Sequence, residues 1–224
     1  VSDQPNPSPV ALAIIEAAVQ AGHPRNPDFN GPQQEGTGLF QTTTRDRRRQ
    51  SSSRAYLSPK RANLHVETGA HATRLVFEGK RVVGIEYRQN GTLKRACAGR
   101  EVVVSGGAFG SPHLLQLSGI GPAGHLGSHG IAVLHDLPGV GSALRDHFYA
   151  STVFRCKEPV TINELARSPI RQAIAGAQYV LARRGPLATN GIFAGIFTRS
   201  DERYDRPNIQ INTNIWSVAG RDRK

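Results

Sequence analysis

The segment from Val102 to Leu117 restricts the possible folds of this chain more than any other part of the sequence. Its first residues, Val102–Val104, are continuously apolar, which predicts a strand from Glu101 to Ser105 that is buried on both faces. The pair Gly106-Gly107 follows, and Ser111-Pro112 then predicts the start of a helix. α/β folds hold nucleotides at such a turn, because the helix end offers free N–H donors and glycine lets a ligand approach the backbone. A tight turn without any ligand accounts for the same pattern equally well.

Short strands joined by turns are predicted on the N-terminal side of this segment. The step Asn90-Gly91 is a strong hairpin signal, because a type I′ turn needs positive φ at both central residues. Runs rich in Val, Ile, Thr and Tyr lie on both sides of it and predict a meander. Its five strands are expected at Leu64–Thr68, Thr73–Phe77, Val82–Arg88, Leu93–Ala98 and Glu101–Ser105, the last being the buried strand described above.

The two ends of the chain predict further helices and strands. A helix is expected from Val10 to Ala21, with Ser8 as its N-cap, and a long loop from His23 to Gly38. Later elements are expected as helices at Pro159–Leu165 and Pro169–Arg183 and as strands at Ile192–Thr198 and Ile209–Ile215. We therefore predict an α/β or α+β fold that contains an antiparallel sheet.

Composition excludes several classes of protein. No stretch reaches the roughly 18 to 20 apolar residues of a membrane span, and no export signal is visible. Cys97 and Cys156 are too few for a disulfide scaffold, which favours a reducing, cytoplasmic location. Methionine is absent and the chain begins at Val1, so we expect a fragment.

The net charge of +11 raises the alternative of a basic domain that binds nucleic acid or another anion. Part of this charge is concentrated in one cluster, which comprises Arg45, Arg47, Arg48, Arg49 and Arg54. No stacking aromatics or docking motif accompany the cluster, and a solvated turn explains it more simply. We therefore expect no nucleic-acid partner.

Residues with catalytic or metal-binding chemistry give weak signals. His125 and His129 stand four apart, but Leu126 occupies the position of the glutamate in a His-Glu-x-x-His zinc motif, and glycines weaken the helix. We expect exposed histidines and no metal site. Asp146-His147 lacks a Gly-x-Ser-x-Gly nucleophile, so a hydrolase is disfavoured.

The segment Gly107–Pro122, which reads GAFGSPHLLQLSGIGP, closely resembles the second signature of the glucose-methanol-choline (GMC) oxidoreductases, and the chain resembles their bacterial choline-dehydrogenase-like branch in particular. Further similarity occurs in the same order along the chain, at residues 28–31, 54–57, 63–66, 137–141, 146–147 and 184–191. The resemblance implies a flavoprotein that oxidises a small alcohol by hydride transfer to FAD.

The resemblance also implies a domain organisation and a set of missing parts. Residues 63–147 correspond to part of the FAD domain, residues 148–224 to part of the substrate domain, and residues 1–62 to a helix and long loop partly in the substrate domain. The family's N-terminal Gly-x-Gly-x-x-Gly segment and its catalytic-histidine region are expected to be missing, so no catalytic residue is assigned. We expect this chain alone to retain no FAD and to be inactive without those parts.

Family roles can be carried over to individual positions. On the cofactor side, the resemblance implies that the Ala72 backbone meets the adenine, that Ser105-Gly106-Gly107 lines the adenosine, and that Asp146 and His147 lie near the flavin domain. On the substrate side it implies Asn190 and Phe193.

The expected substrate class depends on Phe193. Choline-oxidising relatives place a glutamate shortly after the motif Thr189-Asn190, where Phe193 stands here. A single ring contributes a cation–π contact of only about 0.5 to 2 kcal/mol to binding of a quaternary ammonium. An uncharged, rather apolar primary alcohol is therefore expected over choline, unless Phe193 is simply a core residue of its strand.

Overall fold

The structure is a computed structural model that describes residues 1–216 except 5, 59–60, 159 and 189–190. Its chain divides into two compact units. Unit 1 comprises residues 1–61 and 151–224, and unit 2 comprises residues 62–150. Among the described residues, none of the helices is long and apolar enough to cross a membrane.

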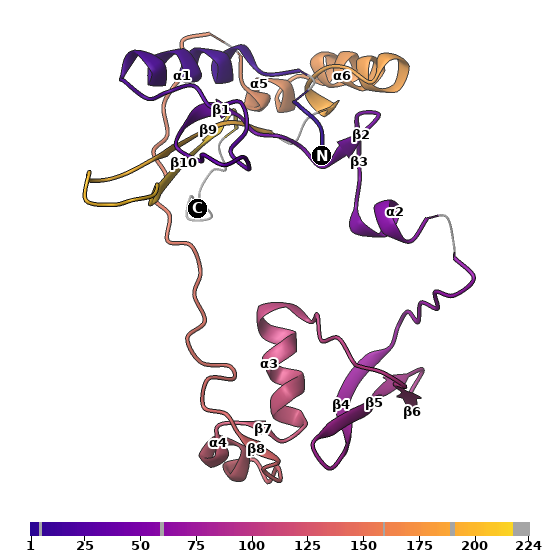
Figure 1. Cartoon of the computed structure of the whole chain (residues 1–224). Helices are drawn as coiled ribbons and strands as arrows, with labels where there is room; N and C mark the ends of the chain where they lie inside the picture. Colours follow the sequence, from indigo (N-terminus) through magenta and orange to yellow (C-terminus); the bar gives the residue numbers. More distant parts are fainter. Residues whose placement is uncertain (5, 59–60, 159, 189–190, 217–224) are drawn as a thin grey trace, which may run out of the picture. The chain divides into compact units, whose positions relative to one another are not determined.

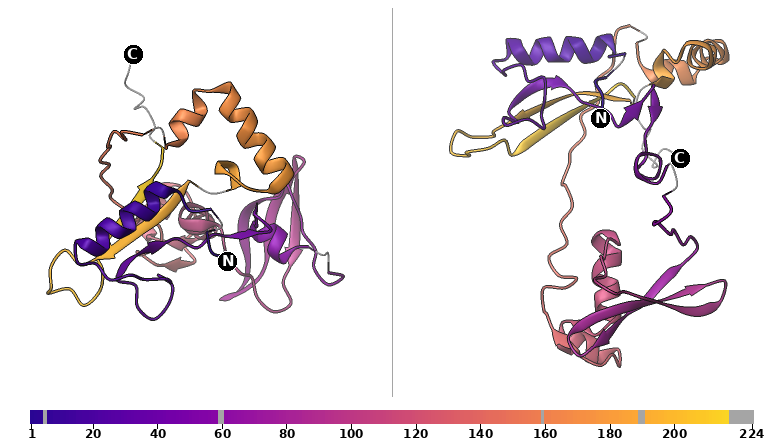
Figure 2. Two further views of the ribbon diagram at one scale, coloured as in Figure 1. Left: turned by 90° about the horizontal axis from the view of Figure 1, so that it is seen from above. Right: turned by 45° about the vertical axis from the view of Figure 1, so that its right-hand side comes forward.

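Unit 1 is built on an antiparallel sheet in the order β1-β9-β10 (Figure 1). Its strands are β1 (Gly36–Leu39), β9 (Ile192–Thr198) and β10 (Ile209–Asn214). Helix α1 (Pro9–Gln20) packs against β1 and β9, and the view from above shows it lying over this sheet (Figure 2). The sequence-based predictions of this helix and of both C-terminal strands are confirmed.

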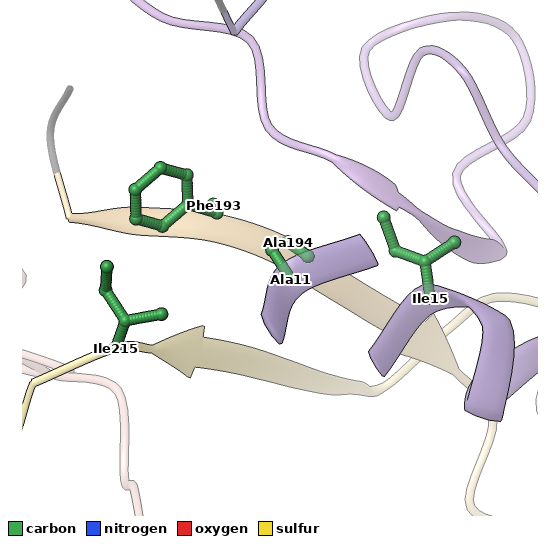
Figure 3. Packing of buried hydrophobic residues seen from close by; sticks show 5 residues of the cluster. All are labelled: Ala11, Ile15, Phe193, Ala194 and Ile215. Carbon is green, nitrogen blue, oxygen red and sulfur yellow. The ribbon is translucent and has the colours of Figure 1, made fainter. Parts of the chain in front are cut away.

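The core of unit 1 lies between α1 and the sheet (Figure 3). Ala11 and Ile15 come from α1, Phe193 and Ala194 from β9, and Ile215 follows β10. Ser8 begins the helix, because its hydroxyl accepts a hydrogen bond from the Val10 N–H and Pro9 follows at the first helical position.

The remaining elements of unit 1 are short apart from one helix. They are β2 (Thr44–Arg45), β3 (Arg48–Arg49), α2 (Ser52–Tyr56), α5 (Ile162–Ala166), α6 (Pro169–Ala182) and the 3₁₀ turn η1 (Pro186–Ala188). The prediction of α6 is confirmed. The helix expected at 159–165 is shorter than predicted, and position 159 lies outside the described residues.

Unit 2 contains a second antiparallel sheet in the order β4-β5-β6. Its strands β4 (His71–Glu78), β5 (Arg81–Gln89) and β6 (Thr92–Cys97) confirm three strands of the predicted meander. Asn90 and Gly91 both have positive φ, as the predicted hairpin turn requires. The unit also holds α3 (Gly107–Leu117), α4 (Ala123–Ser128) and the parallel pair β7 (Ile120–Gly121) and β8 (His135–Asp136).

Three local predictions in unit 2 are wrong. Residues 64–68 and 101–105 form no strand, and the Val103 side chain is 77% exposed instead of buried on both faces. A central strand needs a hydrogen-bonded neighbour on each side, and the described residues place none beside Val102–Val104. Helix α3 begins at Gly107, four residues before the predicted start at Ser111.

Candidate functional site

The residues Ser105, Gly106 and Gly107 form the turn that leads into α3, and all three are exposed. Gly106 is the N-cap of the helix, and a Cβ at this position would lie 2.9 Å from both the Gly110 carbonyl carbon and the Ser111 nitrogen. Gly107 has φ +77° and open space around it. The turn therefore needs glycine at both positions. Gly106 leaves no room for a Cβ, and Gly107 adopts a positive φ that other residues rarely adopt.

The first turn of α3 leaves backbone donors available. The first four N–H groups of an α-helix have no acceptor within the helix, and no side chain caps those of α3. Ser111 instead accepts a hydrogen bond at 2.9 Å from the Gly106 N–H, which tightens the turn. No acidic side chain lies in this first helical turn, so nothing there repels an anionic or oxygen-rich ligand.

Two polar side chains position α3 in unit 2. The Ser118 hydroxyl donates to the Leu114 carbonyl at 2.6 Å and accepts from the Leu75 N–H at 2.9 Å, so it joins the end of α3 to β4. Gln116 donates from Nε2 to the Val140 carbonyl at 3.0 Å and holds the loop after β8 against the same helix. Sequence reasoning missed both roles, although two polar residues near the end of an apolar helix are a readable signal.

Ala72 lies on β4, the strand that Ser118 connects to α3. It is half-buried and faces Tyr87 of β5. Because β4 is an edge of its sheet, its outer backbone groups have no strand partner among the described residues. The structure thus places the expected adenine-side strand and the expected adenosine-side turn on elements that pack together.

Asp146 and His147 lie near the end of unit 2, and both are exposed. The Asp146 carboxylate accepts a hydrogen bond at 2.7 Å from the His147 N–H. Within the described part of the chain, no hydrogen bond or ion pair connects either residue to the turn before α3. Their expected place near the cofactor is therefore a prediction that rests on the family resemblance alone.

The two expected substrate residues belong to unit 1. Asn190 lies outside the described residues. The Phe193 side chain is 2% exposed and packs in the core with Ala11 and Ile15. This environment favours the alternative in which Phe193 is a core residue of its strand.

One glycine pattern in unit 2 has the spacing of a dinucleotide-binding motif but not the structure around it. Gly119, Gly121 and Gly124 have the Gly-x-Gly-x-x-Gly spacing, but they follow helix α3 instead of a strand. The Asp136 carboxylate also accepts the Ala123 N–H at 2.9 Å and occupies the N-terminus of α4. A carboxylate at this place excludes a pyrophosphate, so the pattern is structural.

The arginine cluster in unit 1 has one member with a structural role. Arg47 donates to the carbonyl groups of Ala182 at 3.4 Å and Arg183 at 3.2 Å, at the end of α6. This contact stabilises the C-terminus of the helix, where cations are favourable. The four other arginines of the cluster are exposed.

Comparisons with known proteins all find similarity to one family of enzymes. A family model described as GMC oxidoreductase matches residues 1–149. An oxygen-dependent choline dehydrogenase from Staphylococcus saprophyticus is 42% identical over 210 residues, and one from Stenotrophomonas maltophilia is 44% identical over 203 residues. These matches cover 93% and 89% of this chain.

The solved structures give a similar result. An FAD-dependent oxidoreductase from Chaetomium thermophilum has a TM-score of 0.73 and 25% sequence identity, over 86% of this chain and 35% of that protein. The chain spans only 37% and 36% of the lengths of the two choline dehydrogenases. The matched relatives are therefore much longer than the sequence printed here.

Proposed function

Because this chain belongs to the GMC oxidoreductase family, we propose that the whole protein oxidises an alcohol by transferring a hydride to FAD. The observation that carries this proposal is the family match over residues 1–149, which includes the turn and helix α3. The names of the relatives support an alcohol as the substrate class and FAD as the cofactor.

We assign the two units to different tasks. Unit 2 would hold part of the FAD, with the Ala72 backbone and the turn Ser105–Gly107 on the adenosine side. Their chemistry fits this role, because the turn is exposed, lacks a Cβ at two positions and presents free N–H donors. Unit 1, with its antiparallel sheet, would form part of the substrate domain.

When bound, FAD supplies the hydride acceptor. The residues of this chain would contribute binding and orientation, and no proton-transfer step is assigned to them. Asp146 and His147 are proposed to support the flavin side of unit 2.

The substrate has two candidates. The relatives named choline dehydrogenases favour choline. The uncharged residue Phe193 favours an apolar primary alcohol, although its burial in the core weakens that argument. Comparison of kcat/KM for choline and for an aliphatic alcohol, measured on the full-length protein, decides between them.

Anaerobic reduction tests the activity directly. The full-length protein should contain FAD whose absorbance near 450 nm is bleached by the correct alcohol, on the order of one equivalent per flavin. The printed chain alone should purify without flavin. Flavin that co-purifies with a chain of this intact mass would overturn the expectation that the missing parts are needed.

The rival proposal, an anion-binding basic domain, predicts a different result. Affinity for DNA would fall steeply with salt, because each neutralised phosphate releases counterions. Among the described residues, the exposed arginines of the cluster are the structural feature that supports it. A salt titration against duplex DNA that shows no binding would exclude DNA as the anion of this alternative.

A further inference from the structure

His125 and His129 lie side by side at the C-terminal end of α4. His125 is on the helix, and His129 is its C-cap residue. Their rings have centroids 4.6 Å apart and are tilted by 58°, and both residues are exposed. Neither residue belongs to the site proposed above, so their juxtaposition requires a separate explanation.

The hydrogen bonds of His129 determine which of its nitrogens is free. Its Nδ1 lies 3.0 Å from the His125 carbonyl oxygen, and a carbonyl only accepts, so Nδ1 carries the proton and donates. The Ser128 hydroxyl donates to the same carbonyl at 2.8 Å and lies 3.1 Å from Nδ1. In the neutral imidazole this leaves the lone pair on Nε2 of His129, which is the arrangement typical of metal-ligating histidines.

The His125 ring has no hydrogen bond of its own within the part of the chain that the structure describes. Both of its nitrogens are available to a ligand from solvent. A metal ion that binds two imidazoles at about 2.0 Å holds the two nitrogens at most about 4 Å apart. The ring centroids lie 4.6 Å apart, and rotation of the His125 ring alone about χ2, a soft torsion in histidine, can bring one of its nitrogens closer to His129 Nε2 while the His129 hydrogen bond is kept.

The short helix is held firmly despite its glycines. Leu126 is completely buried, and its carbonyl accepts hydrogen bonds from the N–H groups of His129 at 3.1 Å and Ile131 at 3.0 Å. The Asp136 carboxylate caps the opposite end of the helix at Ala123. The backbone thus fixes the two rings on neighbouring turns before any ligand arrives.

Although the sequence predicts exposed histidines without a metal, the ring geometry points to a different role, and we propose that His125 and His129 form a two-histidine chelate site for a borderline divalent transition metal. Imidazole nitrogen suits Cu²⁺, Ni²⁺ and Zn²⁺, and poorly suits Mg²⁺ or Ca²⁺. The described residues contain no group of three or more His, Cys, Asp or Glu side chains, so water completes the coordination. The site is open and exchangeable, and it is distinct from a closed structural zinc site.

Titration of the full chain with NiCl₂ tests the proposal by calorimetry at pH 7.5. The background variant Cys97→Ser/Cys156→Ser removes the two exposed thiols, which bind the same metals. His125→Ala and His129→Ala should each weaken Ni²⁺ binding at least about tenfold, because the second imidazole binds at a high effective concentration. His113→Ala, which removes another exposed histidine of unit 2, should leave the affinity unchanged.

Further measurements separate chelation from unspecific binding. Cu²⁺ should bind more tightly than Ni²⁺, in the general order of divalent-metal affinity for nitrogen ligands. Circular dichroism of the variants checks that α4 and its surroundings remain folded. Absence of one-to-one Ni²⁺ binding, or wild-type affinity in either His→Ala variant, overturns the proposal.

Discussion

Removal of the Ser118 hydroxyl should destabilise unit 2 more than the loss of one ordinary hydrogen bond would. Ser118 and Leu75 are both buried, and the hydroxyl is the acceptor of the Leu75 N–H. Ser118→Ala leaves this N–H buried without a partner, which costs about 1 to 3 kcal/mol of unfolding free energy. The Leu114 carbonyl loses a donor in the same variant.

Ser142→Ala provides the matched control in the same unit. Its hydroxyl also donates to a backbone carbonyl, that of Gly139 at 3.0 Å, but Ser142 is exposed and water replaces the bond. We expect a change below about 0.5 kcal/mol for this variant. Amide hydrogen exchange of Leu75 and its neighbours measures the local free energy, and urea denaturation measures the midpoint for the chain.

The two variants together decide the argument. Ser118→Ala should accelerate exchange at Leu75 and lower the urea midpoint, and Ser142→Ala should do neither. If Ser118→Ala changed the exchange rate and the urea midpoint as little as Ser142→Ala does, the reasoning would be refuted. The buried Leu75 N–H would then have found another partner at no cost.

Three further predictions concern packing, backbone space and pH. Leu126→Ala should lower the unfolding free energy by about 2 to 5 kcal/mol, measured by urea denaturation, because the side chain is completely buried. Gly106→Ala should cost about 1 to 3 kcal/mol in the same assay and reduce FAD content in the full-length protein, because its Cβ would lie 2.9 Å from the backbone of Gly110 and Ser111. The pKa of Glu67 should lie below its usual range, mainly because the Gln89 side chain donates a hydrogen bond to the carboxylate. The ionised Glu67 therefore stabilises the folded state at a pH above the pKa of Glu67 in the unfolded chain. This stabilisation is lost as the pH falls through the pKa of Glu67 in the folded chain. Gln89→Ala should raise that pKa in a carboxyl NMR titration.

Local signals account for the elements that were predicted correctly. Helix α1 is specified by Ser8, Pro9 and an apolar run, and the β5–β6 hairpin by Asn90-Gly91. In each case the cap or the turn involves residues that are close in sequence. The sequence of that short segment is therefore enough to predict the cap or the turn, without knowledge of the rest of the chain. The same holds for α6, whose N-cap Ser168 accepts from the Arg171 N–H.

The strand expected at Glu101–Ser105 depends on distant partners and is wrong, although β9, whose partner β1 is also distant in sequence, is predicted correctly. The apolar run Val102–Val104 was expected to be a buried strand, but burial requires neighbouring strands, and within the described residues no strand pairs with it. The start of α3 was misplaced for a related reason. Serine is a residue type that is common at N-caps, which is why Ser111 predicts a helix start. In the structure its hydroxyl accepts a hydrogen bond from the Gly106 N–H, and the helix begins earlier, at Gly107.

The polar residues of the signature segment Gly107–Pro122 explain why the candidate turn can be positioned even though residues 101–105, all of them described, form no strand before it. Ser118 connects the end of α3 to β4, and Gln116 connects the same helix to the loop at Val140. Both contacts act on the half of α3 opposite to Ser105–Gly107, so they orient the helix axis and leave its N-terminal donors exposed. Two tasks are therefore separated along one helix, with glycines at the end that we propose faces the cofactor and hydrogen-bonding side chains at the anchored end. This division predicts that substitutions at Ser118 change stability first, whereas substitutions at Gly106 or Gly107 change cofactor content as well.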